Sequence, residues 1–249
     1  MTLTVRQFPC LSDNYGFLAR DEASGLVACI DTPDAEAIKR ELATAGWDLH
    51  LILNTHWHPD HAGGNEALKA ATGATVVGPA EVSRIAAPDR VVAHGDMVML
   101  GETRFEVIDT GGHTLGHVTY HDAADAIAFV GDTLFALGCG RLFEGDAQQM
   151  WASLQRIADL PEDTTVYCAH EYTASNARFA LSVDGSAALK TRAEAIFAAR
   201  ERGEPTVPTT IALERATNPF LRAPILRPDI ADPAEAFGAV RAAKDGFKG

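Results

Sequence analysis

The chain has 249 residues, of which 47% are hydrophobic and 22% are charged, and its formal net charge at pH 7 is -13. This composition excludes a disordered chain and predicts either one substantial packed domain or one such domain followed by a smaller domain. The acidic balance argues against binding to the phosphates of nucleic acid, although a local basic pocket can still hold a small anionic substrate.

Short strands and helices alternate in the first third of the chain. Apolar runs that are partly β-branched and bounded by turn residues predict strands at residues 2–8, 15–20, 25–31, 49–54 and 74–78. Helical patterns lie between them, at residues 34–46 and 65–72, and Gly46 can end the first of these helices. This alternation is typical of an α/β domain.

The middle of the chain returns to strands, which we expect at residues 103–110, 117–122, 126–132 and 164–170. Before the last of these, Asp146 and Gln149 have the spacing of a capping box, which predicts a helix over 146–160.

After about residue 172 only helical patterns remain, at residues 173–183, 186–203, 209–217 and 232–247. The last one starts with Asp232, Pro233 and Glu235 in N-cap, N1 and N3 order. We therefore predict an α/β domain over residues 1–173 and a helical domain over residues 174–249.

The cysteines and the apolar runs of the sequence indicate the cellular compartment. The four cysteines lack C-x-x-C spacing and are expected to be buried apolar residues in a reducing cytoplasm: Cys10, Cys29, Cys139 and Cys168. No apolar run approaches the roughly 18 residues of a membrane span, and the first residues lack the apolar stretch of a secretory signal. We expect no membrane partner and no nucleic-acid partner.

Three histidines and an aspartate fall within six residues of the stretch "THWHPDH", namely His56, His58, Asp60 and His61. A structural zinc site built from one loop would more often include cysteine, so imidazole and carboxylate ligands favour a catalytic site for zinc, iron or manganese. In an extended segment His56 and His58 point the same way and can bind one metal. Asp60 and His61 lie beyond Pro59 and could face a second metal.

Three further ligand-type residues each follow an apolar strand: His113, Asp132 and His170. A carboxylate such as Asp132 can bridge two cations, with one oxygen on each. This predicts one metal held by His56, His58, His113 and Asp132. The other would be held by Asp60, His61, His170 and Asp132. We do not expect the remaining histidines to be ligands: His50, His94, His117 and His121.

The stretch "THWHPDH" resembles the T-H-x-H-x-D-H signature of the metallo-β-lactamase superfamily, and His113, Asp132 and His170 stand where that superfamily places its remaining ligands. The resemblance implies a four-layer αββα sandwich, here followed by a C-terminal α-helical domain. Further stretches look like the hydroxyacylglutathione hydrolases, known as glyoxalase II, over essentially the whole chain: "GDTLFALGCGRLFEG", "YCAHEYTASNARFA", "NPFLR" and "VRAAKDGF".

This second resemblance implies a set of glutathione contacts. Tyr172 matches a tyrosine that contacts the glutathione backbone, and Arg241 and Lys244 match a basic pair that holds the glycine carboxylate. Arg141 stands where many members have lysine, so its charge is kept and its geometry changes. Phe143 stands where some members have tyrosine, so a hydroxyl is lost. Taken alone, the spacing of Arg241 and Lys244 also fits a solvated helix face.

The implied reaction is hydrolysis of S-D-lactoylglutathione to D-lactate and glutathione by a metal-bridged hydroxide, the second step of methylglyoxal detoxification. Asp60 would orient the hydroxide and Asp132 would bridge two divalent metal ions, with zinc expected first and iron or manganese left open. We expect a monomer whose partner is the glutathione thioester.

Three other functions are alternatives, although nothing in the sequence favours the last of them. A glutathione persulfide dioxygenase would use one iron, a lactonase or other hydrolase of the same fold would act on another acyl substrate, and a metal-binding module would have no turnover. The second set of metal ligands favours the thioesterase over the dioxygenase.

Overall fold

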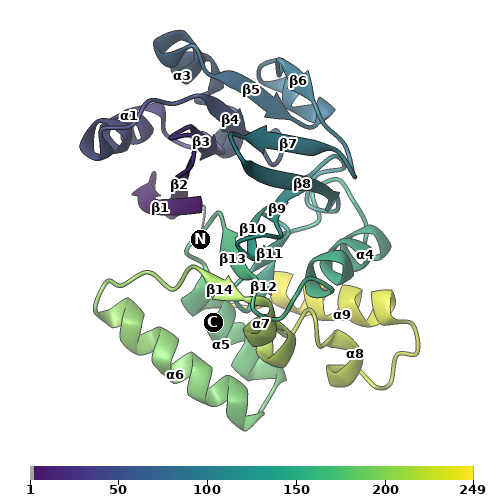
Figure 1. The fold of residues 1–249 in the computed structure, drawn as a ribbon. Coiled ribbons are helices and arrows are strands. Elements are labelled where there is room, and N and C mark those ends of the chain that lie inside the picture. The colour runs from purple at the N-terminus through teal and green to yellow at the C-terminus, as the bar shows by residue number, and fades with distance from the viewer. Residues whose placement is uncertain (1–2, 249) are drawn as a thin grey trace. The chain divides into compact units, whose positions relative to one another are not determined.

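The computed structural model describes residues 3–248 (Figure 1). The chain forms two compact units. The first consists of the residues up to Asp109 together with Gly116–Gly131, and the second of Thr110–Leu115 together with the residues from Asp132 onward. Thr2, where the first predicted strand begins, and the outermost positions of the two predicted domains lie outside the described residues. The predicted boundary between residues 173 and 174 stays a prediction.

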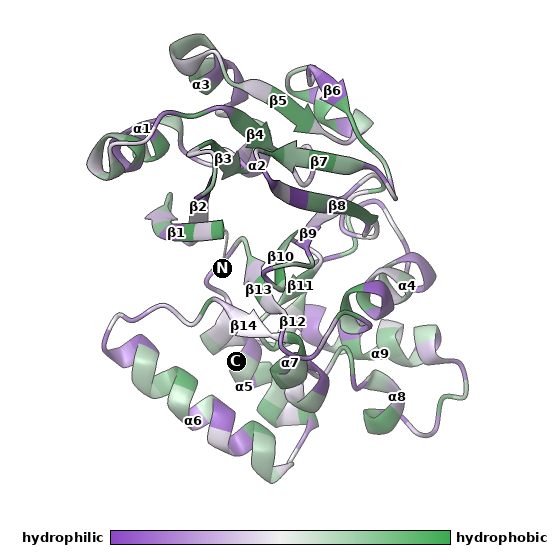
Figure 2. Cartoon of the chain, in the orientation of Figure 1, coloured by the Kyte–Doolittle hydropathy of each residue, from purple (hydrophilic) through white to green (hydrophobic). Residues whose placement is uncertain are grey.

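A six-stranded sheet is the first layer of the first unit. Its strands follow each other in chain order: β1 (Leu3–Cys10), β2 (Asn14–Asp21), β3 (Val27–Ile30), β4 (Leu51–Leu53), β5 (Thr75–Gly78) and β6 (Arg90–Val91). The first three strands pair antiparallel, and β3 to β6 pair parallel. Inner parallel strands are covered on both faces and need apolar residues throughout. Accordingly β3 is buried along its whole length and carries the hydrophobic colour in Figure 2.

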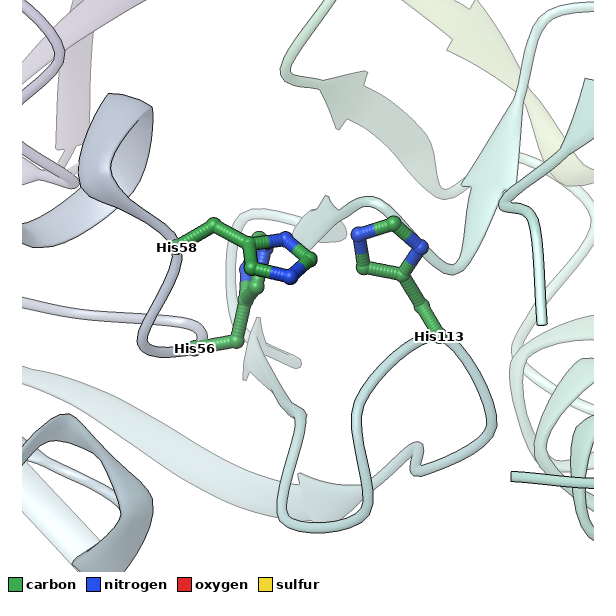
Figure 3. A group of neighbouring side chains, drawn as sticks. All are labelled: His56, His58 and His113. Atoms are coloured by element: carbon green, nitrogen blue, oxygen red, sulfur yellow. The ribbon is translucent and has the colours of Figure 1, made fainter. Parts of the chain in front are cut away.

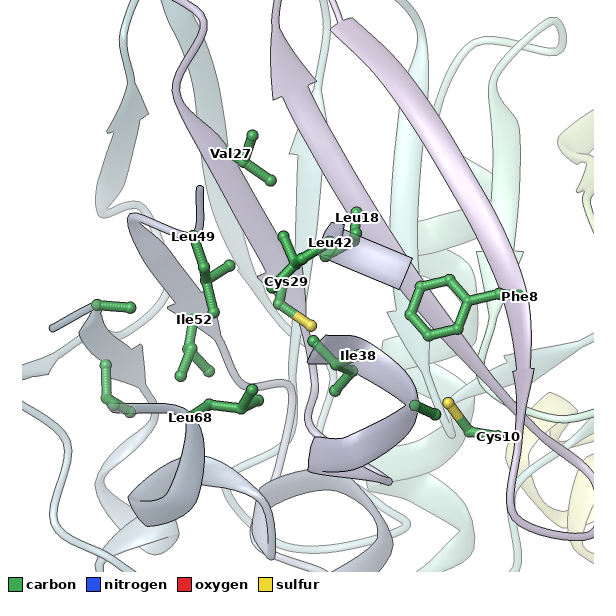
Figure 4. Close-up of a cluster of buried hydrophobic side chains, with 13 residues drawn as sticks. Phe8, Cys10, Leu18, Val27, Cys29, Ile38, Leu42, Leu49, Ile52 and Leu68 are labelled. Atoms are coloured by element: carbon green, nitrogen blue, oxygen red, sulfur yellow. The ribbon is translucent and has the colours of Figure 1, made fainter. Parts of the chain in front are cut away.

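The helices α1 (Ala35–Ala45) and α3 (Asn65–Thr72) pack on this sheet. Asp34 caps α1 with its side chain, and Gly46 ends it in the left-handed conformation, so the predicted helix is confirmed. The apolar faces of both helices meet the strands in one cluster of buried side chains (Figure 4). Its large members include Phe8, Leu18, Ile38, Leu42, Ile52 and Leu68.

Four antiparallel strands form the second layer of this unit, in the order β10, β9, β8, β7. Their bounds are β7 (Met97–Leu100), β8 (Thr103–Asp109), β9 (Val118–Asp122) and β10 (Ile127–Gly131). The two layers face each other, because the Phe17 ring of β2 lies 5.8 Å from that of Phe129 on β10. The Tyr120 hydroxyl also donates to the Asn54 carbonyl at 2.9 Å. The sequence did not predict β7, which becomes a strand by pairing with β8.

The imidazole of His121 is buried on β9, and neither ring nitrogen has a hydrogen-bond partner among the described residues. Burial lowers the pKa of His121 below its usual 6.5 and outweighs the opposite effect of Glu106 and Asp122. The unfolded chain keeps the usual value, so it binds the proton more readily than the folded chain does. The contribution of His121 to the free energy of unfolding is therefore fully present above pH 6.5 and is lost as the pH falls below that value.

We expect His121→Phe to raise the free energy of unfolding by about 1–2 kcal/mol at pH 5.5 and by less at pH 8, because it removes an unpaired buried polar group. Urea unfolding at the two pH values measures this difference. Burial raises the pKa of the Asp122 carboxyl, so protonation of this group favours the folded chain. This effect appears at lower pH and is opposite in sign to that of His121. His94→Phe, at an exposed position, is the control. An equal gain in both variants would contradict the assignment to His121.

The second unit contains short strands and most of the helices. Its elements are β11 (Leu134–Phe135), β12 (Gly138–Cys139), α4 (Ala147–Ala158), β13 (Thr165–Cys168), α5 (Thr173–Val183), α6 (Ala187–Glu201), β14 (Thr209–Thr210), α7 (Ile211–Thr217), α8 (Ala223–Leu226) and α9 (Pro233–Asp245). The predicted caps of two helices are confirmed, since the Asp146 and Asp232 side chains accept backbone hydrogen bonds at the starts of α4 and α9.

One helix in this unit starts later in the structure than the sequence predicts. Residues 209–217 were expected to be helical throughout, but Thr209 and Thr210 form β14 and pair antiparallel with β13. Helix α7 starts only at Ile211, where the Thr210 side chain accepts a hydrogen bond from the Leu213 amide. Pairing with a strand more than 40 residues earlier decides this boundary, and no local pattern carries that information.

All four cysteines are buried and unbridged, as expected. Burial raises the pKa of Cys139 to about 11 and that of Cys168 to about 12, so neither thiol ionises near neutral pH. None of the helices within residues 3–248 combines the length and the apolar character that a bilayer crossing requires.

Candidate active site

The first set of predicted ligands lies in the first unit, directly after β4. His56 and His58 project from the loop that follows the strand, and their rings lie next to each other (Figure 3). The Nε2 atom of His56 is 3.0 Å from the Nδ1 atom of His58. The predicted pairing of these two side chains is therefore present in the structure.

Asp60 and His61 belong to the short helix α2 (Pro59–Ala62), which starts with proline at its first position. The His61 Nε2 atom lies 3.5 Å from the Asp60 Oδ2 atom, and the rings of His61 and His56 are 4.0 Å apart. The Asn14 amide donates to Asp60 Oδ2 at 3.1 Å. All four predicted ligands of this unit therefore gather at one place.

Asp31 supports this cluster and was missed by the sequence analysis. Its carboxylate is buried and accepts hydrogen bonds from the backbone and the side chain of Thr55, each at 2.7 Å. Its Oδ2 atom also lies 2.8 Å from His61 Nδ1. Such a contact sets the tautomer of a ligand histidine and directs its Nε2 atom toward a metal. A signal was present, because Asp31 follows an apolar strand in the same way as Asp132 does.

The second set of predicted ligands lies in the second unit. Asp132 is buried and its two carboxylate oxygens face different histidines. Oδ2 lies 3.3 Å from His113 Nε2, and Oδ1 lies 3.4 Å from His170 Nε2. Figure 3 shows the ring of His113 projecting from its own loop. One oxygen for each histidine is the arrangement that a bridging carboxylate requires.

The spacing of these atoms fits metal ligands. Two ligands of one tetrahedral zinc ion, each about 2.1 Å from the metal, lie about 3.4 Å apart. Within each unit the separations are close to this value, at 3.3 Å and 3.4 Å around Asp132 and 3.5 Å between Asp60 and His61. The Arg141 carbonyl lies 2.9 Å from His113 Nδ1, which directs the Nε2 atom of His113 toward the carboxylate. The donor sets of both units thus suit divalent cations.

The remaining histidines have other surroundings. His50 Nδ1 accepts a hydrogen bond from the Val27 amide, and His94 Nδ1 accepts one from the Asp109 amide. His117 is buried with its ring 4.8 Å from that of His56. None of the groups of His, Asp and Glu side chains that could hold an ion among the described residues includes any of them.

A pocket of about 480 Å³ opens in the second unit. Two predicted metal ligands, His113 and Asp132, lie in its wall. The wall also contains the five predicted substrate residues: Arg141, Phe143, Tyr172, Arg241 and Lys244. Such a pocket suits an anionic ligand whose one end reaches His113 and Asp132 and whose charged end meets the cations.

The cationic end of the pocket is formed by α9. Arg241 is not on a solvated helix face, since only 5% of it is exposed. Its Nη1 atom donates to the Cys139 carbonyl at 3.0 Å, and its Nη2 atom pairs with Asp245 at 2.9 Å. Lys244 donates to the Ser175 carbonyl at 3.2 Å. Burial, with help from neighbouring arginines, lowers the pKa of Lys244 to about 8.

Two aromatic rings border the pocket. Tyr172 stacks on His170 with the two rings nearly parallel and 4.6 Å apart. Phe143 packs edge-on against His113 at 5.2 Å, and 62% of it is exposed. An exposed phenyl ring beside His113 offers an apolar contact to a bound molecule and no hydrogen bond.

Two family descriptions match the chain. The one described as "Metallo-beta-lactamase superfamily" covers residues 29–170, and the one described as "Hydroxyacylglutathione hydrolase C-terminus" covers residues 171–247. The hydroxyacylglutathione hydrolase of Erythrobacter litoralis is 55% identical over 98% of this chain and 100% of its own length. That of Maricaulis maris is also 55% identical, over 98% of this chain and 99% of its own length.

Solved structures resemble the chain over most of its length. ETHE1 from Myxococcus xanthus is 30% identical with a TM-score of 0.71, over 96% of this chain and 90% of that protein. TTHA1623, solved in a di-iron-bound form, is 26% identical with a TM-score of 0.63, over 88% of this chain and 100% of that protein.

Proposed function

Because the chain belongs to the hydroxyacylglutathione hydrolases of the metallo-β-lactamase superfamily, we propose that it hydrolyses the thioester of S-D-lactoylglutathione to D-lactate and glutathione. This membership confirms the predicted metallo-β-lactamase fold with a helical C-terminal region. The observation that carries the proposed reaction is the pocket of the second unit, where two of the proposed metal ligands share one wall with buried Arg241 and half-buried Lys244. The reaction would be the second step of methylglyoxal detoxification.

We propose that the predicted ligands hold two divalent ions. One ion would be held by His56, His58, His113 and Asp132. The other would be held by Asp60, His61, His170 and Asp132. Such ions supply hydroxide near neutral pH and polarise a carbonyl. Zinc suits these ligands, and the di-iron form of the relative TTHA1623 makes iron a second candidate.

The side chains around the ions would prepare the substrate for attack. Asp60, held by the Asn14 amide, would accept a hydrogen bond from the attacking water and orient it toward the thioester carbon. Arg241 and Lys244 would hold the glycine carboxylate of glutathione, and Tyr172 would contact the tripeptide backbone. Fixing the substrate at its distant end places the carbonyl for reaction. The thiolate of glutathione then leaves.

The grip of Lys244 should depend on pH. The protonated amine binds the carboxylate, and its pKa of about 8 means that the charge is lost as the pH rises through that value. We therefore expect KM for the glutathione thioester to rise between pH 7 and pH 9.5. Lys244→Arg keeps its charge over this range and should flatten the rise. An equal rise of KM in both proteins would assign the effect to another group.

The reaction is tested with purified protein loaded with zinc or iron, by following thiol release from S-D-lactoylglutathione and from the matching coenzyme A thioester. Cleavage of the glutathione ester alone supports the reaction and the cationic grip. Cleavage of both supports the chemistry and removes the specific role of Arg241 and Lys244. If neither is cleaved, oxygen uptake with glutathione persulfide tests for a dioxygenase, and lactone hydrolysis tests for a lactonase.

We also propose that the enzyme works as a monomer in the cytoplasm. Four buried, unbridged thiols support a reducing compartment.

A further inference from the structure

A short hairpin connects Asp132 to Arg141 in the second unit, and we call Leu134–Gly140 the active-site hairpin. Its strands pair at only two positions, from Leu134 opposite Cys139 to Phe135 opposite Gly138. Leu137 at its tip has a φ of 56°, in the left-handed region that side chains disfavour. A hairpin this short does not hold its own shape. Its conformation must come from neighbouring side chains.

Asn218, directly after α7, binds two carbonyls of the hairpin. Its side-chain amide donates to the Phe135 carbonyl at 3.1 Å and to the Gly138 carbonyl at 3.0 Å. These carbonyls belong to residues that face each other across the hairpin, so one amide group joins both strands. Asn218 is fully buried, and its own Oδ1 atom accepts from the Phe220 amide.

Side chains of the helices α7 and α5 bind the tip of the hairpin. The Glu214 carboxylate of α7 accepts a hydrogen bond from the Leu137 amide at 2.9 Å and another from Asn218. The Asn176 side chain of α5 donates to the Ala136 carbonyl at 3.1 Å. Glu214 is fully buried and forms an ion pair with Arg192. The unfavourable conformation of Leu137 is thus held by partners from two helices.

The ends of the hairpin reach two of the predicted metal ligands. A Cβ atom on Gly140 would lie 2.0 Å from the Asp132 carbonyl oxygen, so the backbone of the outgoing strand packs directly against Asp132. The next residue, Arg141, places its carbonyl 2.9 Å from His113 Nδ1. A shift of the hairpin would therefore move the backbone beside Asp132 and remove the contact that orients His113.

We propose that Asn218, Glu214 and Asn176 are positioning residues, which set the hairpin and through it the geometry of Asp132 and His113. The helical region then has a second role beside substrate binding. The inference rests on the proposed function, because Asp132 and His113 matter to the reaction only as metal ligands. The alternative is that the three side chains contribute stability alone.

The test compares Asn218→Ala and Asn176→Ala with Asp184→Asn. Asp184 is buried in the same helical region, and its side chain bonds only Ser186 and Arg222 among the described residues. Asp184→Asn therefore weakens buried hydrogen bonds that do not involve the hairpin. Asn176→Ala removes a single hydrogen bond to the hairpin and serves if Asn218→Ala fails to fold.

Three measurements on the metal-loaded, full-length proteins separate position from stability. These are hydrogen exchange of a peptide covering residues 134–140, the visible spectrum of the cobalt-substituted protein, and kcat with S-D-lactoylglutathione well below the melting temperature. In the asparagine variants we expect exchange of the hairpin amides about 10-fold faster, altered cobalt bands, and kcat reduced about 10- to 100-fold, as for other residues that orient metal ligands. Asp184→Asn should change only the melting temperature.

Asparagine variants that melt earlier but keep the wild-type exchange, spectrum and kcat would overturn the proposal, and so would equal changes in Asp184→Asn. If wild-type protein does not cleave the thioester, the proposed function fails. Hairpin exchange and the cobalt spectrum would still decide whether these residues position the ligands.

Discussion

Replacement of Asp132 by alanine is expected to lower kcat/KM for thioester hydrolysis by roughly 10³-fold or more and to reduce the bound metal below two ions per chain. The reason is that one carboxylate serves two histidines. Its oxygens lie 3.3 Å from His113 and 3.4 Å from His170, so one substitution removes a ligand from both proposed ions. Elemental analysis of the purified variant and steady-state kinetics measure the two effects.

A matched control is Asp159→Ala, at an exposed position after α4, which should leave metal content and kinetics unchanged. Asp132→Asn keeps one acceptor oxygen and should fall between the alanine variant and wild type in metal content. An alanine variant that retains two ions and full activity would show that Asp132 is not the bridge.

Replacement of Arg241 by methionine is expected to raise KM for S-D-lactoylglutathione about 10- to 100-fold, because a charged hydrogen-bond partner of the substrate carboxylate is lost. We expect kcat to fall as well, since Arg241 also binds the Cys139 carbonyl of the active-site hairpin. Lys244 makes no such contact with the hairpin, so Lys244→Met should raise KM without changing kcat. Initial rates over a range of thioester concentrations separate the two parameters.

Arg227→Met is the control for this pair, because Arg227 lies in the same helical region and pairs on the surface with Asp229. It should leave KM unchanged. A variant at Arg241 with wild-type KM would place the glycine carboxylate elsewhere in the pocket. Equal losses of kcat at Arg241 and Lys244 would argue against the separate contact of Arg241 with the hairpin.

The four histidine and aspartate side chains of "THWHPDH" were accessible to sequence reasoning because their grouping is local. A turn of six residues cannot separate His56, His58, Asp60 and His61 far from one another, and the structure gathers them after β4. The same holds for the caps of α4 and α9, where an acidic side chain reaches amides two or three residues away. Short sequence separation makes the partner part of the pattern.

The supporting residues were not accessible in this way. Asn218 reads as an ordinary turn residue before proline, and its carbonyl partners lie 80 and 83 positions earlier. Glu214 reads as an exposed residue of a helix, yet it is fully buried against the Leu137 amide. Arg241 fits a solvated face equally well until the fold buries it against a carbonyl 102 positions away.

The sequence by itself thus determined the alternating elements, the metal-type ligands and the resemblance that points to glutathione thioesters. These depend on residue type and on spacing within a few positions. Tertiary structure alone decided where β14 replaces the start of a predicted helix and which buried side chains hold the active-site hairpin. Such contacts are set by the packing of whole elements, and that packing depends on many distant residues together.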